Sequence, residues 1–382
     1  FNKQFTEKRT VNRDNRSMSR LYTFESNLSL TGANSDHRIP VKSAHNPIYI
    51  SELWNILSKK IGKKVFAKYR PPLVSYDQSK KSLIKTDLLE KVAEDLIANL
   101  GSSLLISDSN DKDVQILVNM INELLGNYGN SIDVNRSYNI RNGDDKKMNE
   151  FLSDLSKGNV SSVIFMNCNP VYDSYLSTKI KDNLSKVTLK ISTSDRIDET
   201  SILCDVIAPD SHFLESWNDY EPIDNSFSFG QPTIKNIFDT RQVQDTFLKW
   251  SGSDDNYFNY LKNSWRSRQK YTDSNEPFQI FWDRLLHDGV AEFINKDKTN
   301  NNPLPSTQKL SYRIASNILT KIKNIKDNIG FELNLYQNLT VSDGIQSNNP
   351  WLQEMPDPIS KVCWDNYLSV NPKDASKLNI ST

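Results

Sequence analysis

Glycine is scarce in this chain. Only 12 of its 382 residues are glycine, which is roughly half of the usual share of ~7%. Glycine-rich loops let backbone N–H groups close around phosphate groups, and neither G-x-G-x-x-G nor G-x-x-x-x-G-K-[ST] occurs here. The sequence therefore disfavours a nucleotide-type cofactor site of the usual kind.

An excess of charge of one sign and long apolar runs are also missing. The 47 Lys and Arg residues balance the 47 Asp and Glu residues, so no net field attracts nucleic acid or anionic lipid. No apolar run approaches the ~18 residues of a membrane-spanning helix; Val163–Met166 is among the longest. The composition, 37% apolar and 25% charged, predicts a globular protein of ~2–3 structural units.

Side chains that bind metals or act as nucleophiles are few and scattered. The cysteines are Cys168, Cys204 and Cys363, and no Cys-x-x-Cys spacing occurs, so they cannot build a zinc or iron–sulfur site by themselves. Their odd number argues against a disulfide framework. His212 and Glu215 have the spacing of a helical metal pair, but no second pair follows. No Gly-x-Ser-x-Gly elbow is present either, so motifs alone indicate no active site.

Strand and helix patterns alternate from residue 86 onward. We expect strands over 102–106, 132–134, 160–166 and 187–191, and helices over 86–100, 114–125, 148–157 and 175–184. Such alternation with short connections is typical of a parallel sheet that helices cover on both faces. The sequence therefore predicts a doubly wound α/β domain with a mostly parallel sheet.

The rest of the chain has a different texture. Residues 1–45 are polar and irregular, and a helix is expected over 50–61. Aromatic-rich helices are expected over 242–250, 257–265 and 277–287, an exposed loop over 294–308, and a strand over 331–341. The predicted domains are 1–85, the end of a preceding α/β domain; 86–252, the doubly wound domain; 253–330, a helical insertion and loop; and 331–382, the start of a C-terminal domain. Both ends of the sequence are expected to be edges of a longer polypeptide.

Ligands of doubly wound sheets bind beyond the carboxyl ends of the strands. The candidate loops are therefore Ser107–Asp111, Asn167–Tyr172 and Ser192–Glu199. A generic α/β module that binds an unrelated small molecule in these loops is one possible function.

Two segments carry a more specific pattern. Residues 161–172 read SSVIFMNCNPVY, and residues 194–217 read SDRIDETSILCDVIAPDSHFLESW. They resemble the molybdopterin oxidoreductase (DMSO reductase) family, whose pattern is a strand, Gly-x-Asn-Pro, then Glu-Thr-Ala, Ala-Asp, Leu-Pro and Leu-Glu. By this resemblance the positions of the pterin pocket are Asn167, Cys168, Asn169, Pro170, Asp195, Glu199 and Asn218.

Three further segments are similar to one branch of that family. Residues 24–38, 231–234 and 349–358 resemble the large iron–sulfur subunit of bacterial alternative complex III. The resemblance implies a fusion to a downstream iron–sulfur part, with cluster-binding cysteines beyond Thr382 and a C-terminal barrel-like domain entered near residues 371–380. It also implies a location at the periplasmic side of the inner membrane and partner subunits that carry haem and quinol sites.

Departures from the family pattern bear on the cofactor. Where catalytic relatives have a Pro-Gly-Thr-Asp loop, residues 42–47 contain no glycine, and Cys168 stands where the family has the glycine before Asn-Pro. Residues 218–224 lack the family's Gly and Arg and contain three carboxylates, Asp219, Glu221 and Asp224.

These departures favour a non-catalytic, cofactor-free scaffold that docks sister subunits of a quinol-oxidising complex through the aromatic segment 247–282 and the region of Trp351 and Trp364. The alternative is a catalytic molybdopterin oxidoreductase in which Asn167, Asn169, Asp195 and Glu199 contact the pterin.

Overall fold

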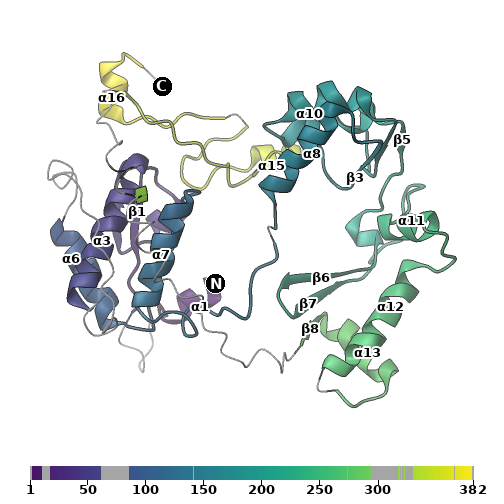
Figure 1. The fold of residues 1–382 in the computed structure, drawn as a ribbon, viewed down its shortest axis with the longest axis horizontal. Helices are drawn as coiled ribbons and strands as arrows, with labels where there is room; N and C mark the ends of the chain where they lie inside the picture. The colour runs from purple at the N-terminus through teal and green to yellow at the C-terminus, as the bar shows by residue number, and fades with distance from the viewer. Residues whose placement is uncertain are drawn as a thin grey trace. The chain divides into compact units, whose positions relative to one another are not determined.

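The computed structural model describes residues 2–10, 18–61, 86–140, 142–272, 274–293, 317–318, 320, 322, 330–364 and 366–380. The chain forms two compact units (Figure 1). Unit 1 comprises Phe1–Ile132 with Pro303–Thr382, and unit 2 comprises Asp133–Asn302. The predicted domain boundaries stay predictions.

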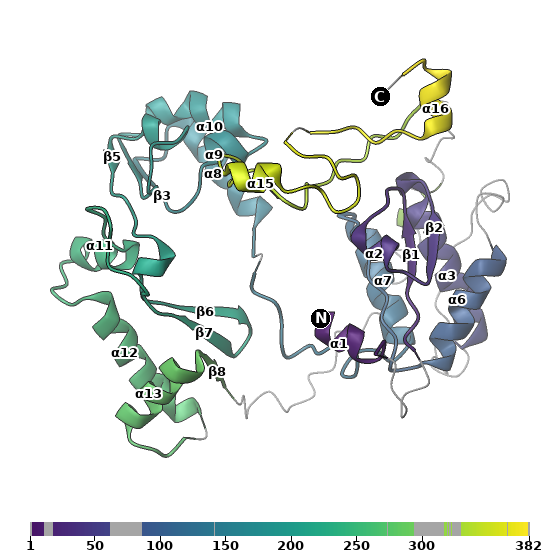
Figure 2. The ribbon, with the colours of Figure 1, turned by 180° about the vertical axis from the view of Figure 1, so that it is seen from behind.

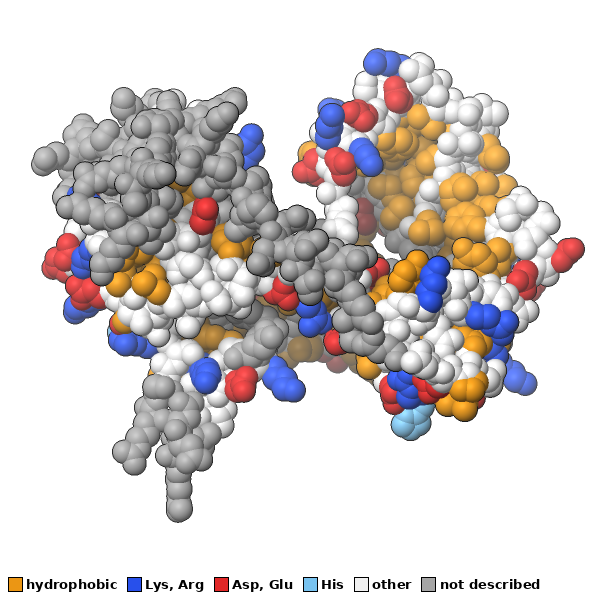
Figure 3. All heavy atoms as spheres, turned by 60° about the horizontal axis from the view of Figure 1, so that its bottom comes forward, with side chains coloured by type: hydrophobic (Ala, Val, Ile, Leu, Met, Phe, Trp, Pro, Cys, Tyr) orange, Lys and Arg blue, Asp and Glu red, His pale blue; other side chains and the backbone are white. Residues whose placement is uncertain are grey.

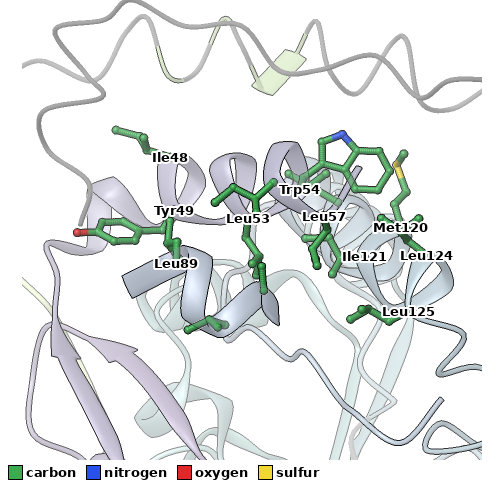
Figure 4. Close-up of a cluster of buried hydrophobic side chains, with 14 of the residues drawn as sticks. Ile48, Tyr49, Leu53, Trp54, Leu57, Leu89, Met120, Ile121, Leu124 and Leu125 are labelled. Carbon is green, nitrogen blue, oxygen red and sulfur yellow. The ribbon is translucent and has the colours of Figure 1, made fainter. Parts of the chain in front are cut away.

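Three helices build the core of unit 1: α3 (Asn46–Lys60), α6 (Thr86–Ala98) and α7 (Lys112–Leu124). Leu53, Trp54 and Leu57 of α3 are buried among apolar side chains of the other two helices (Figure 4). Full burial of such a side chain stabilises the fold by about 1.5–3 kcal/mol. Local signals fix where α7 begins and ends, because the Asp111 carboxylate accepts hydrogen bonds from two backbone N–H groups of its first turn and Gly126 follows it with a φ of +70°.

Two short parallel strands complete the N-terminal part of unit 1. β1 (Tyr22–Glu25) pairs with β2 (His37–Pro40), and α1 (Asn2–Glu7), α2 (Leu30–Ala33) and η1 (Ser43–His45) flank them (Figure 2). The Glu25 carboxylate accepts hydrogen bonds from Ser29 and Arg38, which ties the α2 turn to both strands. The prediction of irregular structure over 1–45 is therefore wrong at these strands.

The C-terminal segment of unit 1 consists mostly of turns. Its two short helices, α15 (Pro350–Glu354) and α16 (Pro372–Lys377), each begin at an Asn that accepts a first-turn N–H and is followed by Pro. The strand predicted over 331–341 is wrong, since the structure has only a single bridge, Asn338 to Ser342, in this stretch.

Unit 2 begins with a parallel sheet of order β3-β4-β5, formed by Ser162–Phe165, Leu189–Ser192 and Val206–Ile207. α8 (Asp145–Lys157), α10 (Ser177–Asn183) and η2 (Leu184–Lys186) bury one cluster with it, in which Leu155, Phe165 and Ile180 are central. Ile164, Leu189 and Val206 are instead exposed, and Figure 3 shows apolar side chains gathered at the upper right of this unit.

An antiparallel sheet and three helices form the rest of unit 2. β6 (Asn218–Ile223), β7 (Ser226–Gly230) and β8 (Val290–Glu292) pair in that order. The helices are α11 (Val243–Trp250), α12 (Tyr257–Arg268) and α13 (Phe278–Asp288), with η5 (Gln269–Tyr271) after α12. Trp265, Phe281 and Trp282 are fully buried between helices and sheet. The large aromatics at the centre of this segment are thus core, whereas Trp250, Tyr260 and Tyr271 are exposed, and the expected docking face stays a prediction.

The architecture is mixed α/β with parallel strand pairs, as the sequence predicted. The strands predicted over 102–106 and 132–134 are wrong, because the Asn122 side chain bonds both the N–H and the C=O of Leu105, and Ile132 makes only one bridge. The doubly wound sheet and the C-terminal barrel stay predictions, and the predicted loop over 294–308 lies outside the described residues.

Candidate functional site

The carboxyl ends of β3, β4 and β5 carry most of the predicted site residues. We call residues 166–173, 193–201 and 208–217 the strand-end loops. Within them lie the short helices α9 (Pro170–Asp173) and η4 (Phe213–Glu215), and η3 (Ser201–Leu203) begins at the last residue of the second loop. The candidate loop Ser107–Asp111 belongs to unit 1, where it precedes α7.

Asn169 is the centre of one hydrogen-bond network in these loops. Its Nδ2 donates to Glu199 Oε2 at 2.7 Å, and its Oδ1 accepts from the Thr200 hydroxyl at 2.6 Å and from the Thr200 N–H at 3.1 Å. The Thr200 Oγ1 in turn accepts from the N–H of Val171. Both polar atoms of the amide are thus occupied in joining the β3 loop to the β4 loop.

Asn167 belongs to a second network. It has a φ of +50°, a conformation that Asn tolerates better than most residues. Its N–H donates to Thr193 Oγ1 and its Nδ2 donates to Asp210 Oδ2, both at 3.3 Å. Asp210 Oδ1 accepts from the N–H of Val243 at the start of α11. Burial raises the pKa of Asp210, against the opposing effect of these hydrogen bonds.

Cys168 is not activated as a nucleophile. The residue is exposed, yet the surrounding chain shields its thiol from water, and this shielding raises the pKa of the thiol. The nearby Asp173 carboxylate raises it further. The thiol is therefore protonated at neutral pH, whereas a nucleophilic cysteine needs a lowered pKa.

Carboxylates dominate the charge of the strand-end loops. These loops contain one arginine and six carboxylates. The carboxylates are Asp173, Asp195, Asp198, Glu199, Asp210 and Glu215. That arginine, Arg196, forms two hydrogen bonds of 2.8 Å with Asp195, which lowers the pKa of Asp195. The positive charge of Arg196 is thus largely offset by the carboxylate of Asp195.

The polar residues of β6 and Asp224, which follows it, have separate partners. Asn218 accepts a hydrogen bond from Gln244, and Asp219 accepts one from the indole N–H of buried Trp265 at 2.9 Å. Glu221 accepts the N–H of Asn225, while Asp224 bonds Ser137 and Asn139. From the sequence, these three carboxylates were expected to lie near a pyrophosphate. In the structure each of them instead accepts hydrogen bonds from a different part of unit 2.

The His212 and Glu215 pair is a helix cap. His212 Nδ1 accepts the N–H of Leu214, and Glu215 Oε2 accepts the N–H of His212 at 3.0 Å. In the part of the chain that the structure describes, no group of three or more His, Cys, Asp or Glu side chains is placed to hold a metal ion. No helix among the described residues is long and apolar enough to cross a membrane.

The structure thus brings together Asn167, Asn169, Pro170 and Glu199 in the strand-end loops. Thr200, which matches the Glu-Thr of the family pattern, completes the Asn169 network, and Thr193 and Asp210, which the sequence had not singled out, complete the Asn167 network. The only sequence signal for Thr193 and Asp210 was their position, directly after a predicted strand and beside Pro209.

Comparison with known proteins gives one distant relative and no family model that matches. Over 95 residues the chain is 30% identical to the menaquinone reductase, molybdopterin-binding-like subunit of Nitratidesulfovibrio vulgaris Hildenborough. The match covers 24% of this chain and 14% of that protein. It supports a relationship of the molybdopterin-oxidoreductase-like kind.

Proposed function

We propose that this chain is a cofactor-free, molybdopterin-oxidoreductase-like scaffold of a quinone-linked respiratory complex of the alternative complex III type. In this role it would hold a downstream iron–sulfur part and dock subunits that carry haem and quinol sites, at the periplasmic side of the inner membrane. The name of the distant relative, a subunit of menaquinone reductase, supports the link to quinone chemistry.

The state of Asn169 carries the proposal. In a pterin site this position would have to offer its amide to the ligand, but here both atoms of the amide bond Glu199 and Thr200. A ligand would have to displace these hydrogen bonds, and each lost bond to a charged group costs about 1.5–3 kcal/mol. The amide is therefore suited to joining two loops and poorly suited to holding a pterin.

Charge argues in the same direction. A pterin pyrophosphate is anionic, whereas the strand-end loops are rich in carboxylates and their one arginine is bonded to Asp195. Two like unit charges 4 Å apart repel by about 4 kcal/mol at an effective dielectric constant of 20. The residues present do not fit this group, so we derive no catalytic step through it.

Exposed tryptophans support the docking role. Trp351 is 82% exposed and Trp364 is 57% exposed. Tryptophan is enriched at the energetic centres of protein interfaces because it buries a large rigid surface. We therefore keep the region of these two residues as a docking face.

Separate assays of molybdenum and of pterin in the full-length subunit, purified from its host, test the proposal. We expect molybdenum and pterin far below one equivalent, and an Asn169→Ala variant that supports the same rate of quinol oxidation in the assembled complex. One equivalent of pterin, together with loss of turnover in that variant, would instead establish the catalytic alternative.

A further inference from the structure

The strand-like stretch at residues 331–337 has no assigned role in the proposed scaffold. Its sequence, FELNLYQ, alternates apolar and polar side chains as a strand does. Phe331, Leu333 and Leu335 are 71%, 74% and 83% exposed. The stretch therefore presents a row of apolar side chains to solvent at the spacing of one face of a β-strand.

The polar residues between them anchor the stretch to unit 1. Asn334 Nδ2 donates to Ser26 Oγ at 2.8 Å, directly after β1, and Glu332 accepts the N–H of Ala44 in η1 at 3.4 Å. One set of alternating side chains thus holds the body of the unit, and the other set is left for contact.

The backbone of the stretch is also available. Among the residues that the structure describes, none forms a hydrogen bond with the backbone N–H or C=O groups of residues 331–337. The structure assigns no strand here, but unpaired backbone groups can pair with an added extended segment, as in the mode of recognition called β-augmentation. The occupant must accordingly supply an extended backbone with apolar side chains at every second position.

Charge narrows the choice of occupant. Residues 330–345 contain two carboxylates, Glu332 and Asp343, and no Lys or Arg. Within the binding stretch itself only Glu332 is charged, so a second copy of this chain would pair carboxylate with carboxylate and bring no cation, whereas opposite charges across a strand pair stabilise it. A basic strand from a different protein fits better than a second copy.

We propose that residues 331–337 bind, by strand addition, an extended segment of a partner subunit that carries alternating apolar side chains and at least one Lys or Arg. This inference rests on the proposed scaffold function and specifies one of its docking surfaces.

Amide hydrogen exchange tests the backbone part of the proposal. We expect fast exchange at residues 331–337 in the isolated full-length subunit and at least tenfold slower exchange in the complex purified with its partner subunits. Slow exchange in the isolated subunit would mean that another part of the same chain covers the stretch, and fast exchange in both would mean that nothing pairs with it. Either result would overturn the proposal.

Substitution tests the side-chain and charge parts. Leu335→Lys and Leu335→Asp remove the same apolar surface, but a basic partner tolerates Asp better. We expect at least a tenfold loss of co-purified partner for Leu335→Lys and a smaller loss for Leu335→Asp, with an unchanged melting temperature of the isolated subunit. The control is Leu100→Lys, at a leucine of unit 1 that is 50% exposed and lies after α6, which should retain the partner.

Equal losses in all three variants, the reverse order of Lys and Asp, or no loss would contradict the proposal. The scaffold function is judged separately, by the molybdenum content and by whether the wild-type complex assembles. If the wild-type complex assembles without pterin while residues 331–337 still exchange fast, strand addition at residues 331–337 is wrong and the scaffold function still holds.

Discussion

At the scale of single residues, the strand-end loops depend on one amide. Asn169 joins the β3 loop to Glu199 and Thr200 through three hydrogen bonds. The bonds to Thr200 are partly buried and the bond to Glu199 is exposed, so losing the amide should cost about 1 kcal/mol, the net worth of a typical hydrogen bond. We expect Asn169→Ala to lower the free energy of unfolding of unit 2 by that amount in urea titrations.

A matched control is Asn159→Ala. Its side chain forms a single exposed hydrogen bond of 3.4 Å with Asp154, so its loss should change stability by less than about 0.5 kcal/mol. Equal effects at the two positions would mean that the Asn169 network does not stabilise the loops.

A second prediction at this scale concerns pH. The Arg9 guanidinium donates two hydrogen bonds to Asp36 and lowers the pKa of that carboxyl to about 2. A carboxyl whose pKa is lowered by folding stabilises the protein above its unfolded pKa of about 3.9, and the stabilisation is lost as the pH falls towards 2. Because the pair is about one fifth exposed, we expect Asp36→Asn to cost about 1–2 kcal/mol at pH 7.

The same substitution should have almost no effect near pH 2, where the wild-type carboxyl is itself half protonated. Urea unfolding at both pH values gives the comparison. Asp374→Asn, at an exposed surface pair with Lys377, serves as a control that should show little change at either pH. A cost of Asp36→Asn that does not vary with pH would contradict the assigned ion pair.

At the scale of elements, α8 and α13 each end at a glycine in the left-handed conformation. Gly158 follows α8 with a φ of +74°, and a Cβ placed there would meet no atom within 4 Å. Only the conformation then opposes a side chain, at a cost of about 1 kcal/mol. We expect Gly158→Ala to lower the melting temperature, as measured by circular dichroism.

Gly143 offers the matched control for that change. It lies just before the Asp144 cap at the other end of α8, is also unobstructed, and has no positive φ. Gly143→Ala should therefore be neutral or slightly stabilising. If it destabilises as much as Gly158→Ala, backbone conformation is not the cause.

At the scale of the whole molecule, the buried residues form separate clusters. One belongs to unit 1, around α3, and two belong to unit 2, around α8 and around α12 and α13. Phe281→Ala should remove about 3–5 kcal/mol from the aromatic cluster. We expect hydrogen exchange in α12 and α13 to accelerate strongly while exchange in α3 stays unchanged.

Leu57→Ala in the core of unit 1 provides the reciprocal experiment. It should accelerate exchange in α3, α6 and α7 and leave the helices α12 and α13 unaffected. Acceleration throughout the chain by either variant would show that the two units unfold as one.

The sequence predicted those elements that depend on interactions between residues close together in the chain. The expected helices over 86–100, 114–125 and 148–157 are confirmed, since caps such as Asp111 and Asp144 and stops such as Gly126 and Gly158 act within one turn. The strand pattern over 102–106 was misleading. A strand forms only if a neighbour supplies hydrogen bonds, and here the Asn122 side chain supplies them to Leu105.

For the candidate site, the sequence likewise predicted which residues lie there but not which partners they bind. Position after a strand was enough to indicate Asn167, Asn169 and Glu199, because parallel strands place their carboxyl ends at one edge. Position could not reveal that Asp210 bonds Asn167 across 43 residues or that Asp219 serves Trp265 across 46 residues. For this reason the sequence could not show that Asp219, Glu221 and Asp224 bind separate partners.

The sequence by itself determined where the main helices lie, the balance of charge and the acidic character of the strand-end loops, because these depend on neighbouring residues and on composition. Only the tertiary structure decided which polar groups pair, that Trp265 and Trp282 are core, and that the backbone of residues 331–337 has no hydrogen-bond partner among the described residues. Those outcomes depend on contacts between residues far apart in the chain, and no local pattern encodes them.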